Sequence, residues 1–291
     1  MSSERTGKLG IFSKTFSGSP DRIFQKAKLL GFDGLHYNMV SSGLPSLPIS
    51  IPPFKVDEIS MAKSRYHLDL CGLSATFNLI HPDHSVREAG FTALEVLSAV
   101  AFELKIPMIT LCTGTHDPTD MWKWHPENKS RGAWLDLISM MERCIQVAEK
   151  YGVKLGVEPE FGNVVHNAVT AKKLLNELRS PVVEVIFDPA NLFATADSSE
   201  EVSEIISHGV ELLGSSISVA HLKDKGLNGM YAPLGMGAID FSLFLKKLDE
   251  INFSGPFIIH GITEAQVPES LNFIRPLLEQ IRNTTIHGKN I

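Results

Sequence analysis

The stretch PVVEVIFDPAN, residues 181–191, joins a short and almost uninterrupted apolar run to an acidic residue. A parallel strand that helices cover on both faces has this composition, whereas a half-exposed antiparallel strand alternates apolar and polar residues. The segment ITLC at 109–112 is similarly apolar. Both segments predict a parallel sheet in an α/β protein, and the first one places Asp188 where a buried strand ends.

Segments of this strand type alternate along the chain with segments of helical periodicity. The predicted strands are at residues 9–12, 34–37, 71–78, 108–112, 154–158, 182–187, 216–221 and 256–260. The predicted helices are at residues 20–30, 53–67, 85–104, 131–151, 168–178, 198–213, 241–251 and 268–282. We expect Ser19, Ser198 and Asp240 to cap the helices that follow them. Gly31 and Gly152 are expected to end the helices before them.

The length of 291 residues suits one large layered domain, because an eight-fold βα barrel typically takes ~250 residues. No Pro/Ser-rich linker divides the chain, and the two longest breaks, 39–53 and 113–129, each follow a predicted strand. In such a barrel these loops lie on the C-terminal face, where active sites are built. We therefore predict a single TIM-barrel domain over residues 1–291.

The alternative fold is an open doubly wound sheet. A nucleotide-binding sheet of that kind would show a GxGxxG turn after its first strand, where this chain has FSKT at 12–15. The barrel is therefore the favoured fold.

The charge balance favours a protein that handles small molecules. Asp and Glu number 33 against 27 Lys and Arg, a net charge of −6, and no Lys/Arg run occurs, whereas duplex binding requires clustered positive charge. The three cysteines, Cys71, Cys112 and Cys144, are too few and too widely spaced for a disulfide framework. The chain also lacks an apolar run of ~18 residues and a signal-peptide core. We expect a cytoplasmic protein without nucleic-acid or membrane partners.

The barrel prediction requires functional side chains where strands run into their following loops. Glu158, Asp188, His221 and His260 occupy this position at four consecutive predicted strands. Two carboxylates and two imidazoles form a ligand set that suits Mn²⁺, Zn²⁺, Fe²⁺ or Co²⁺ better than Ca²⁺. The non-functional alternatives are a surface acid at Glu158, an Asx-turn or helix cap at Asp188 before Pro189, and structural histidines.

Further polar side chains follow the same strands. Glu160 lies two residues after Glu158, so on an extended chain both carboxylates can point to one side. They could share a cation or divide into ligand and base, and an exposed turn is the alternative for Glu160. Asn191 could bind a polar substrate or its own turn, and Lys223 lies two residues after His221.

Two loops offer further candidate contacts. The loop at 113–129 could cover a sugar-like ligand or pack in a subunit interface, and its aromatic and imidazole residues are His116, Trp122, Trp124 and His125. In PLGMGAIDF, residues 233–241, the backbone NH groups of Gly235 and Gly237 could approach a phosphate. A flexible turn that leads to the cap at Asp240 is the simpler alternative.

The motifs GVEPE, FDPAN, HLKD and PLGMGAIDF resemble those of the xylose isomerase-like TIM-barrel superfamily, the sugar phosphate isomerase and epimerase group. The resemblance covers nearly the whole chain. It implies a divalent metal, often Mn²⁺, held by Glu, Asp, His and Glu from strands five to eight. The first three carry over to Glu158, Asp188 and His221, whereas His260 stands where the epimerases have a glutamate. In the 3-epimerases that glutamate and its partner on strand five move a proton on opposite faces of the ketose.

The apurinic-endonuclease branch of the superfamily, which uses three zinc ions, is less similar. It has a histidine three residues after the strand-six aspartate, where this chain has Asn191. It also has Asp-x-His after strand seven, where this chain has GMGA at 235–238. The resemblance therefore does not imply a tri-zinc nuclease.

Residues and resemblance together predict a divalent-metal-dependent sugar or sugar-phosphate isomerase or epimerase that works through an enediolate. By this resemblance Glu158 would be the base that removes the proton from the substrate carbon, and Glu160 is the alternative base. His260 would return the proton, and Lys223 would bind or neutralise substrate oxygens. The other substrate-binding candidates are Asn191, His116, Trp122 and His125.

The expected cofactor is Mn²⁺, with Zn²⁺, Co²⁺, Mg²⁺ or Fe²⁺ as alternatives. The expected partner is a small carbohydrate substrate, and a homodimer or homotetramer is the expected assembly. Two alternative functions stay open. One is a metal-dependent lyase or dehydratase on inositol- or shikimate-like keto substrates, and the other is a metal-free binding barrel.

Overall fold

Eight parallel strands close into a barrel in the computed structural model, which describes residues 7–287. Going around the barrel, the strand order is β1-β10-β7-β6-β5-β4-β3-β2. The strands are β1 (Leu9–Phe12), β2 (Gly34–Tyr37), β3 (Asp69–Ser74), β4 (Met108–Leu111), β5 (Lys154–Val157), β6 (Val183–Phe187), β7 (Ile217–Leu222) and β10 (Phe257–Ile259). The barrel closes where β1 pairs with β10, with Leu9 opposite Phe257.

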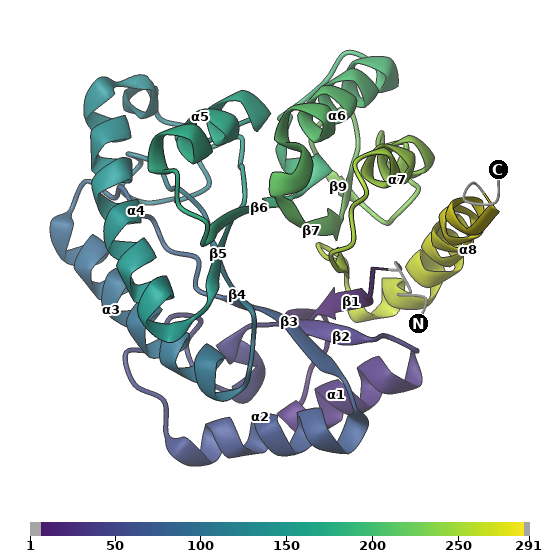
Figure 1. Ribbon diagram of the computed structural model, residues 1–291, viewed down its shortest axis with the longest axis horizontal. Coiled ribbons are helices and arrows are strands. Elements are labelled where there is room, and N and C mark those ends of the chain that lie inside the picture. The colour runs from purple at the N-terminus through teal and green to yellow at the C-terminus, as the bar shows by residue number, and fades with distance from the viewer. Residues whose placement is uncertain (1–6, 288–291) are drawn as a thin grey trace.

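Eight α-helices surround the strands, as Figure 1 shows. They are α1 (Pro20–Leu29), α2 (Pro53–Tyr66), α3 (His84–Glu103), α4 (Arg131–Tyr151), α5 (Ala168–Leu178), α6 (Ser199–Leu213), α7 (Phe241–Glu250) and α8 (Val267–His287). Short 3₁₀ turns occupy Ser13–Thr15, Met39–Ser42, Pro126–Lys129, Pro189–Asn191, Gly214–Ser216 and Glu264–Gln266. This confirms the predicted single-domain (β/α)₈ TIM barrel. Residues 1–6 and 288–291 of the predicted domain lie outside the described residues.

Local signals in the sequence set the helix boundaries. The side chains of Ser19, Ser198 and Asp240 accept hydrogen bonds from backbone NH groups in the first turns of α1, α6 and α7, as predicted. Gly152 has φ +65° and ends α4 in the left-handed conformation that glycine adopts without strain.

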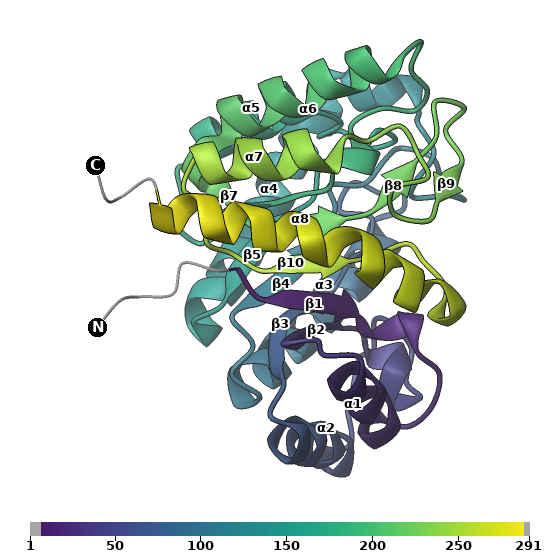
Figure 2. The ribbon, with the colours of Figure 1, turned by 90° about the vertical axis from the view of Figure 1, so that its right-hand side faces the viewer.

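The structure differs from the prediction at the third strand, in an additional hairpin, and in the last helix, which spans Val267–His287 rather than 268–282. The third strand spans Asp69–Ser74 rather than 71–78, because Asn78 beyond its end binds the neighbouring loop: its Nδ2 donates to the Thr115 carbonyl at 2.8 Å. A small antiparallel hairpin, β8 (Asp224–Lys225) with β9 (Tyr231–Ala232), was not predicted. Figure 2 shows this hairpin beyond the end of the barrel toward which the β1 arrow points.

The barrel interior is filled by side chains below the C-terminal face. A cluster of buried residues separate from the main core comprises Cys71, Met108, Ile186, Val219 and Ile258. Gly156 leaves room for this cluster, since a Cβ there would lie 2.5 Å from Met108 Sδ. All three cysteines are buried and free, as expected. Within residues 7–287, none of the helices combines the length and apolarity that a membrane span needs.

Candidate metal centre

Four side chains from the carboxyl ends of β5, β6, β7 and β10 converge on one point. Glu158, Asp188, His221 and His260 each offer one ligand atom, and these atoms all lie within 4.8 Å of one another. His221 Nδ1 lies 3.3 Å from both Glu158 Oε1 and Asp188 Oδ2. His260 Nδ1 lies 4.0 Å from Asp188 Oδ2. Four adjacent strands of the barrel thus bring together residues that are 102 positions apart in sequence (158 to 260).

The distances of 3.3 Å and 4.0 Å between these atoms fit ligands of one transition-metal ion. Ligands at about 2.0–2.2 Å from a common ion lie roughly 3–4 Å from one another. The donor chemistry also fits, because imidazole and carboxylate together suit Zn²⁺, Mn²⁺ and Fe²⁺. The buried Nδ1 of His260 has no hydrogen-bond partner among the described residues, so it is available as a ligand.

The electrostatics favour positive charge at the same point. Burial opposes charge on both His221 and Asp188, but each stabilises the charge of the other. The pKa of His221 is raised to about 9 because Glu158 and Asp188 outweigh the effect of burial. Lys223 and the two histidines hold the pKa of Asp188 well below its usual value despite complete burial. Two carboxylates facing one nitrogen stabilise a cation there, either a proton or a metal ion.

Asn191 connects the cluster to Lys223. Asn191 Nδ2 donates a hydrogen bond to Glu158 Oε1 at 2.6 Å, and Lys223 Nζ donates to Asn191 Oδ1 at 2.7 Å. Lys223 Nζ also lies 3.6 Å from Asp188 Oδ2 and 4.5 Å from the centre of the Tyr231 ring. The Asn191 side chain therefore contacts the candidate ligands rather than only its own turn.

Glu160 lies beside this group. Burial raises its pKa to about 8, with Lys223 opposing the shift and the negative charges of Glu158 and Asp188 adding to it. A carboxyl group in such surroundings can hold or release a proton near neutral pH. Glu160 is thus close to Glu158 and Asp188, two of the converging ligands.

His36 on β2 is a polar residue of this region that the sequence analysis missed. It is fully buried, its ring stacks on Phe12 at 5.0 Å between centres, and it meets the His221 ring edge-on at 5.9 Å. Its Nε2 lies 2.5 Å from Thr110 Oγ1. The signal in the sequence is an imidazole inside the short strand GLHY, whose other residues are apolar or aromatic.

The three candidate residues of the long loop after β4, His116, Trp122 and His125, make no direct contact with the cluster among the described residues. The rings of His116 and His125 are 6.3 Å apart, and the side chain of Trp122 is half exposed. In the described part of the chain, no hydrogen bond, ion pair or ring contact joins these three residues to the four converging side chains. The loop is tied instead to the segment after β5, where Asn163 Nδ2 donates to the Met121 carbonyl at 2.9 Å.

The glycine loop after β9 has its backbone donors already occupied. The NH groups of Gly235 and Gly237 both donate to Asp224 Oδ2 at 2.9 Å. Asp224 Oδ1 also accepts from the Lys225 NH at 2.8 Å. A buried carboxylate therefore takes the place that a phosphate would need, and the loop is a structural turn rather than a phosphate cradle.

Comparisons with known proteins agree with this fold. The sequence pattern of the family described as "Xylose isomerase-like TIM barrel" matches residues 24–277. A curated relative, the uncharacterized protein MJ1311 of Methanocaldococcus jannaschii, is 22% identical over 249 residues, which are 83% of this chain and 80% of that protein.

Solved structures show the same architecture. The 3-keto-D-glucoside 4-epimerase YcjR from E. coli has a TM-score of 0.75 at 18% identity, covering 93% of this chain and 99% of that one. The IOLI protein with a binding zinc atom has a TM-score of 0.70 at 15% identity, covering 95% and 98%. Further sugar epimerases have similar folds. At these identities the similarity establishes a shared fold.

Proposed function

The chain belongs to the xylose isomerase-like TIM-barrel family, and from this we propose that it is a divalent-metal-dependent isomerase or epimerase of sugars or sugar phosphates. The observation that carries the proposal is the convergence of Glu158, Asp188, His221 and His260 at the C-terminal face. Sugar epimerases and a zinc-binding protein among the structures of the same fold support it.

The proposed ligands are the four converging side chains. A divalent ion held there would polarise a substrate carbonyl and its neighbouring hydroxyl, which makes the adjacent C–H more acidic. Mn²⁺ remains the first expectation from the family resemblance. The second imidazole, His260, favours Zn²⁺ or Fe²⁺ more than an all-carboxylate set would.

The chain's own groups would move the proton. Glu158 is the proposed base, and the hydrogen bond from Asn191 Nδ2 fixes one of its oxygens. Lys223, buried beside the carboxylates, would offset negative charge on a substrate oxygen. Removing and returning the proton at one carbon also needs correct placement of the sugar, for which Asn191 and Lys223 are candidate contacts.

Epimerisation requires a second proton-transfer group, because the proton leaves one face of the carbon and returns to the other. His260 cannot serve with Nδ1 if that nitrogen binds metal. Glu160, two residues from Glu158, is a nearby carboxyl group that is not one of the four proposed ligands. We propose Glu160 for this role. A shift of carbonyl position along the sugar could use Glu158 alone for the carbon-bound proton, with the hydroxyl proton passing from one substrate oxygen to the other.

The test combines elemental analysis with a panel of ketoses and their phosphates. Wild type should take up about one equivalent of metal and exchange a substrate hydrogen with D₂O. Glu158→Gln should abolish exchange, and metal retained in that variant would identify a base, while metal loss would identify a ligand. Glu160→Gln is the matched comparison: exchange without epimerisation would assign it the second proton transfer.

Two results would overturn the proposal. One is less than about one-tenth of an equivalent of any transition metal after reconstitution, which would favour a binding barrel. The other is formation of an absorbing enone from keto-inositol or dehydroshikimate without any sugar conversion, which would favour a lyase or dehydratase.

A further inference from the structure

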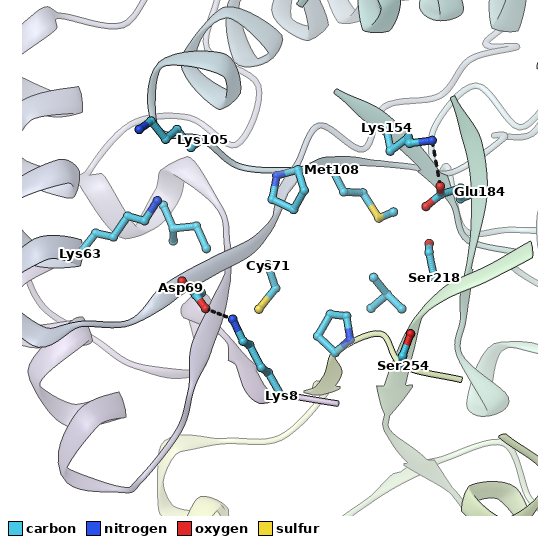
Figure 3. A pocket seen from close by; sticks show the side chains of 14 residues that line it. Lys8, Lys63, Asp69, Cys71, Lys105, Met108, Lys154, Glu184, Ser218 and Ser254 are labelled. Carbon is cyan, nitrogen blue, oxygen red and sulfur yellow. Dashed lines mark hydrogen bonds and ion pairs between the residues drawn. The ribbon is translucent and has the colours of Figure 1, made fainter. Parts of the chain in front are cut away.

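The end of the barrel opposite the candidate metal centre contains a cavity of about 570 Å³. Its lining comes from the amino ends of β3, β4, β5, β6 and β7, and from residues that precede β1 and β10 (Figure 3). Ligand pockets commonly measure ~300–1,000 Å³, so the cavity has room for a small molecule. The cavity lies at the amino ends of the strands, whereas the proposed metal ligands lie at their carboxyl ends, so the two sites are separate.

The floor of this cavity is apolar. Cys71, Met108 and Val219 contribute buried side chains that belong to the cluster inside the barrel. Ser218 and Ser254 place hydroxyl groups on one flank, as Figure 3 shows. The floor can therefore contact the carbon skeleton of a ligand, while this flank offers hydrogen bonds.

The rim of the cavity carries more positive than negative charge. Four lysines line it against two carboxylates, and both carboxylates are already paired. Lys8 forms an ion pair with Asp69, and Lys154 Nζ lies 3.2 Å from Glu184 Oε1. The other two lysines, Lys63 and Lys105, form no ion pair with a carboxylate in the described residues. The rim thus has two uncompensated positive charges in a chain of net charge −6.

Lys63 and Lys105 both line the flank opposite the serines (Figure 3). Lys63 Nζ donates to the Leu104 carbonyl at 2.7 Å, which fixes it beside the residue that precedes Lys105. Burial lowers the pKa of Lys63, the negative charge of Asp69 opposes this shift, and the positive charge of Lys105 adds to it. An anion that lies between the two ammonium groups would offset their repulsion.

We propose that this cavity binds a phosphate monoester, with the phosphate between Lys63 and Lys105 and the organic part on the apolar floor. A phosphate dianion matches the two uncompensated charges, whereas a single carboxylate would leave one of them unmatched. Lysine ammonium groups bind phosphate as point charges. The hydroxyl groups of Ser218 and Ser254 lie where polar atoms of the organic part would face them.

The experiment titrates the full-length chain with inorganic phosphate by calorimetry, at constant ionic strength and with excess chelator. The double variant Lys63→Met/Lys105→Met should bind phosphate at least about tenfold more weakly than wild type. The control Lys28→Met/Lys246→Met removes two exposed lysines outside the cavity and should bind as wild type does. The single variant Lys105→Gln keeps the Lys63–Leu104 hydrogen bond. It should also bind phosphate more weakly than wild type, and it replaces the double variant in the test if that variant folds poorly.

Equal phosphate affinity in wild type and the double variant would overturn the proposal, as would no binding by wild type up to about 50 mM phosphate. Lys223→Met separates this site from the metal centre, because Lys223 is the buried ammonium group at that end and the proposal expects its variant to bind phosphate as wild type does. If phosphate binding is lost in Lys223→Met and retained in Lys63→Met/Lys105→Met, the anion binds at the other end of the barrel.

Discussion

Asn191 holds Glu158 in place: its Nδ2 donates a hydrogen bond of 2.6 Å to Glu158 Oε1, while its Oδ1 accepts one of 2.7 Å from Lys223. A single amide thus fixes the proposed base and the nearby ammonium group. Since Asn191 is 1% exposed, water cannot easily replace it. The orientation of the proposed base therefore depends on a residue that is not itself a proposed metal ligand.

Asn191→Ala should lower turnover or metal affinity by about 10–100-fold, the usual effect of removing a group that orients a ligand. Titration with Mn²⁺ and Zn²⁺, together with the D₂O exchange assay, measures both. Asn176→Ala, on the exposed face of α5, is the control and should change neither. If Asn191→Ala has the turnover and metal affinity of wild type, Glu158 does not need the hydrogen bond from Asn191.

Asp188→Asn should remove the effect of metal on thermal unfolding. An ion that binds the folded chain at 100 times its Kd stabilises it by about 2.7 kcal/mol, which raises Tm by about 5 °C in a chain of this size. Asp188 is fully buried among the proposed ligands, so its amide analogue should abolish that rise. The exposed Asp197→Asn is the control. An identical rise in Asp188→Asn would place the metal elsewhere.

Asp224→Asn should destabilise the loop at 233–239. Its carboxylate accepts hydrogen bonds from Gly235, Gly237 and Lys225, and an amide nitrogen cannot accept them. Leaving buried NH groups unpaired should lower the free energy of unfolding by about 2 kcal/mol. Denaturant unfolding measures this loss, and limited proteolysis should show faster cleavage in the loop. Unchanged stability and cleavage would mean that water replaces the carboxylate.

The strand-end rule predicted the barrel and the four converging residues because it depends only on local pattern. Apolar strands that end in Glu158, Asp188 and His221 already imply which edge these residues share. His36 and the hairpin at Asp224 were missed because their environments are set by long-range contacts. His36 gains its place from Thr110, and Asp224 from glycines more than ten residues away.

The cavity near Lys63 and Lys105 was also beyond prediction. Lys63 lies in the last turn of α2, and Lys105 follows the end of α3. Basic residues are common at helix C-termini, so neither lysine indicates a binding site by its position in the sequence. Only the arrangement of the strands shows that their ammonium groups lie on one flank of a cavity. The sequence shows that both residues are lysines, but not that they line the same cavity.

The three cysteines should be inert in the folded chain. Burial raises the pKa of Cys71 and of Cys144 to about 12, and it also raises that of Cys112. Because the thiolate is the reactive form, an aromatic disulfide reagent should modify none of them rapidly at pH 8. All three should react after unfolding in guanidinium. A fast-reacting thiol in the native protein would show that one of these sites opens to solvent.

His260→Glu should shift the metal preference of the centre. It replaces an imidazole with a carboxylate at the position where the resembling epimerases have glutamate, giving three oxygens and one nitrogen. Carboxylate ligands suit Mn²⁺ and Mg²⁺, whereas imidazole suits Zn²⁺, so the ratio of Mn²⁺ to Zn²⁺ affinity should rise by about tenfold. The neutral His260→Gln is the matched control, because it removes the imidazole without adding charge. It should weaken both metals without reversing their order. If His260→Glu and His260→Gln give the same ratio as wild type, His260 does not contact the ion, and the proposed ligand set reduces to Glu158, Asp188 and His221.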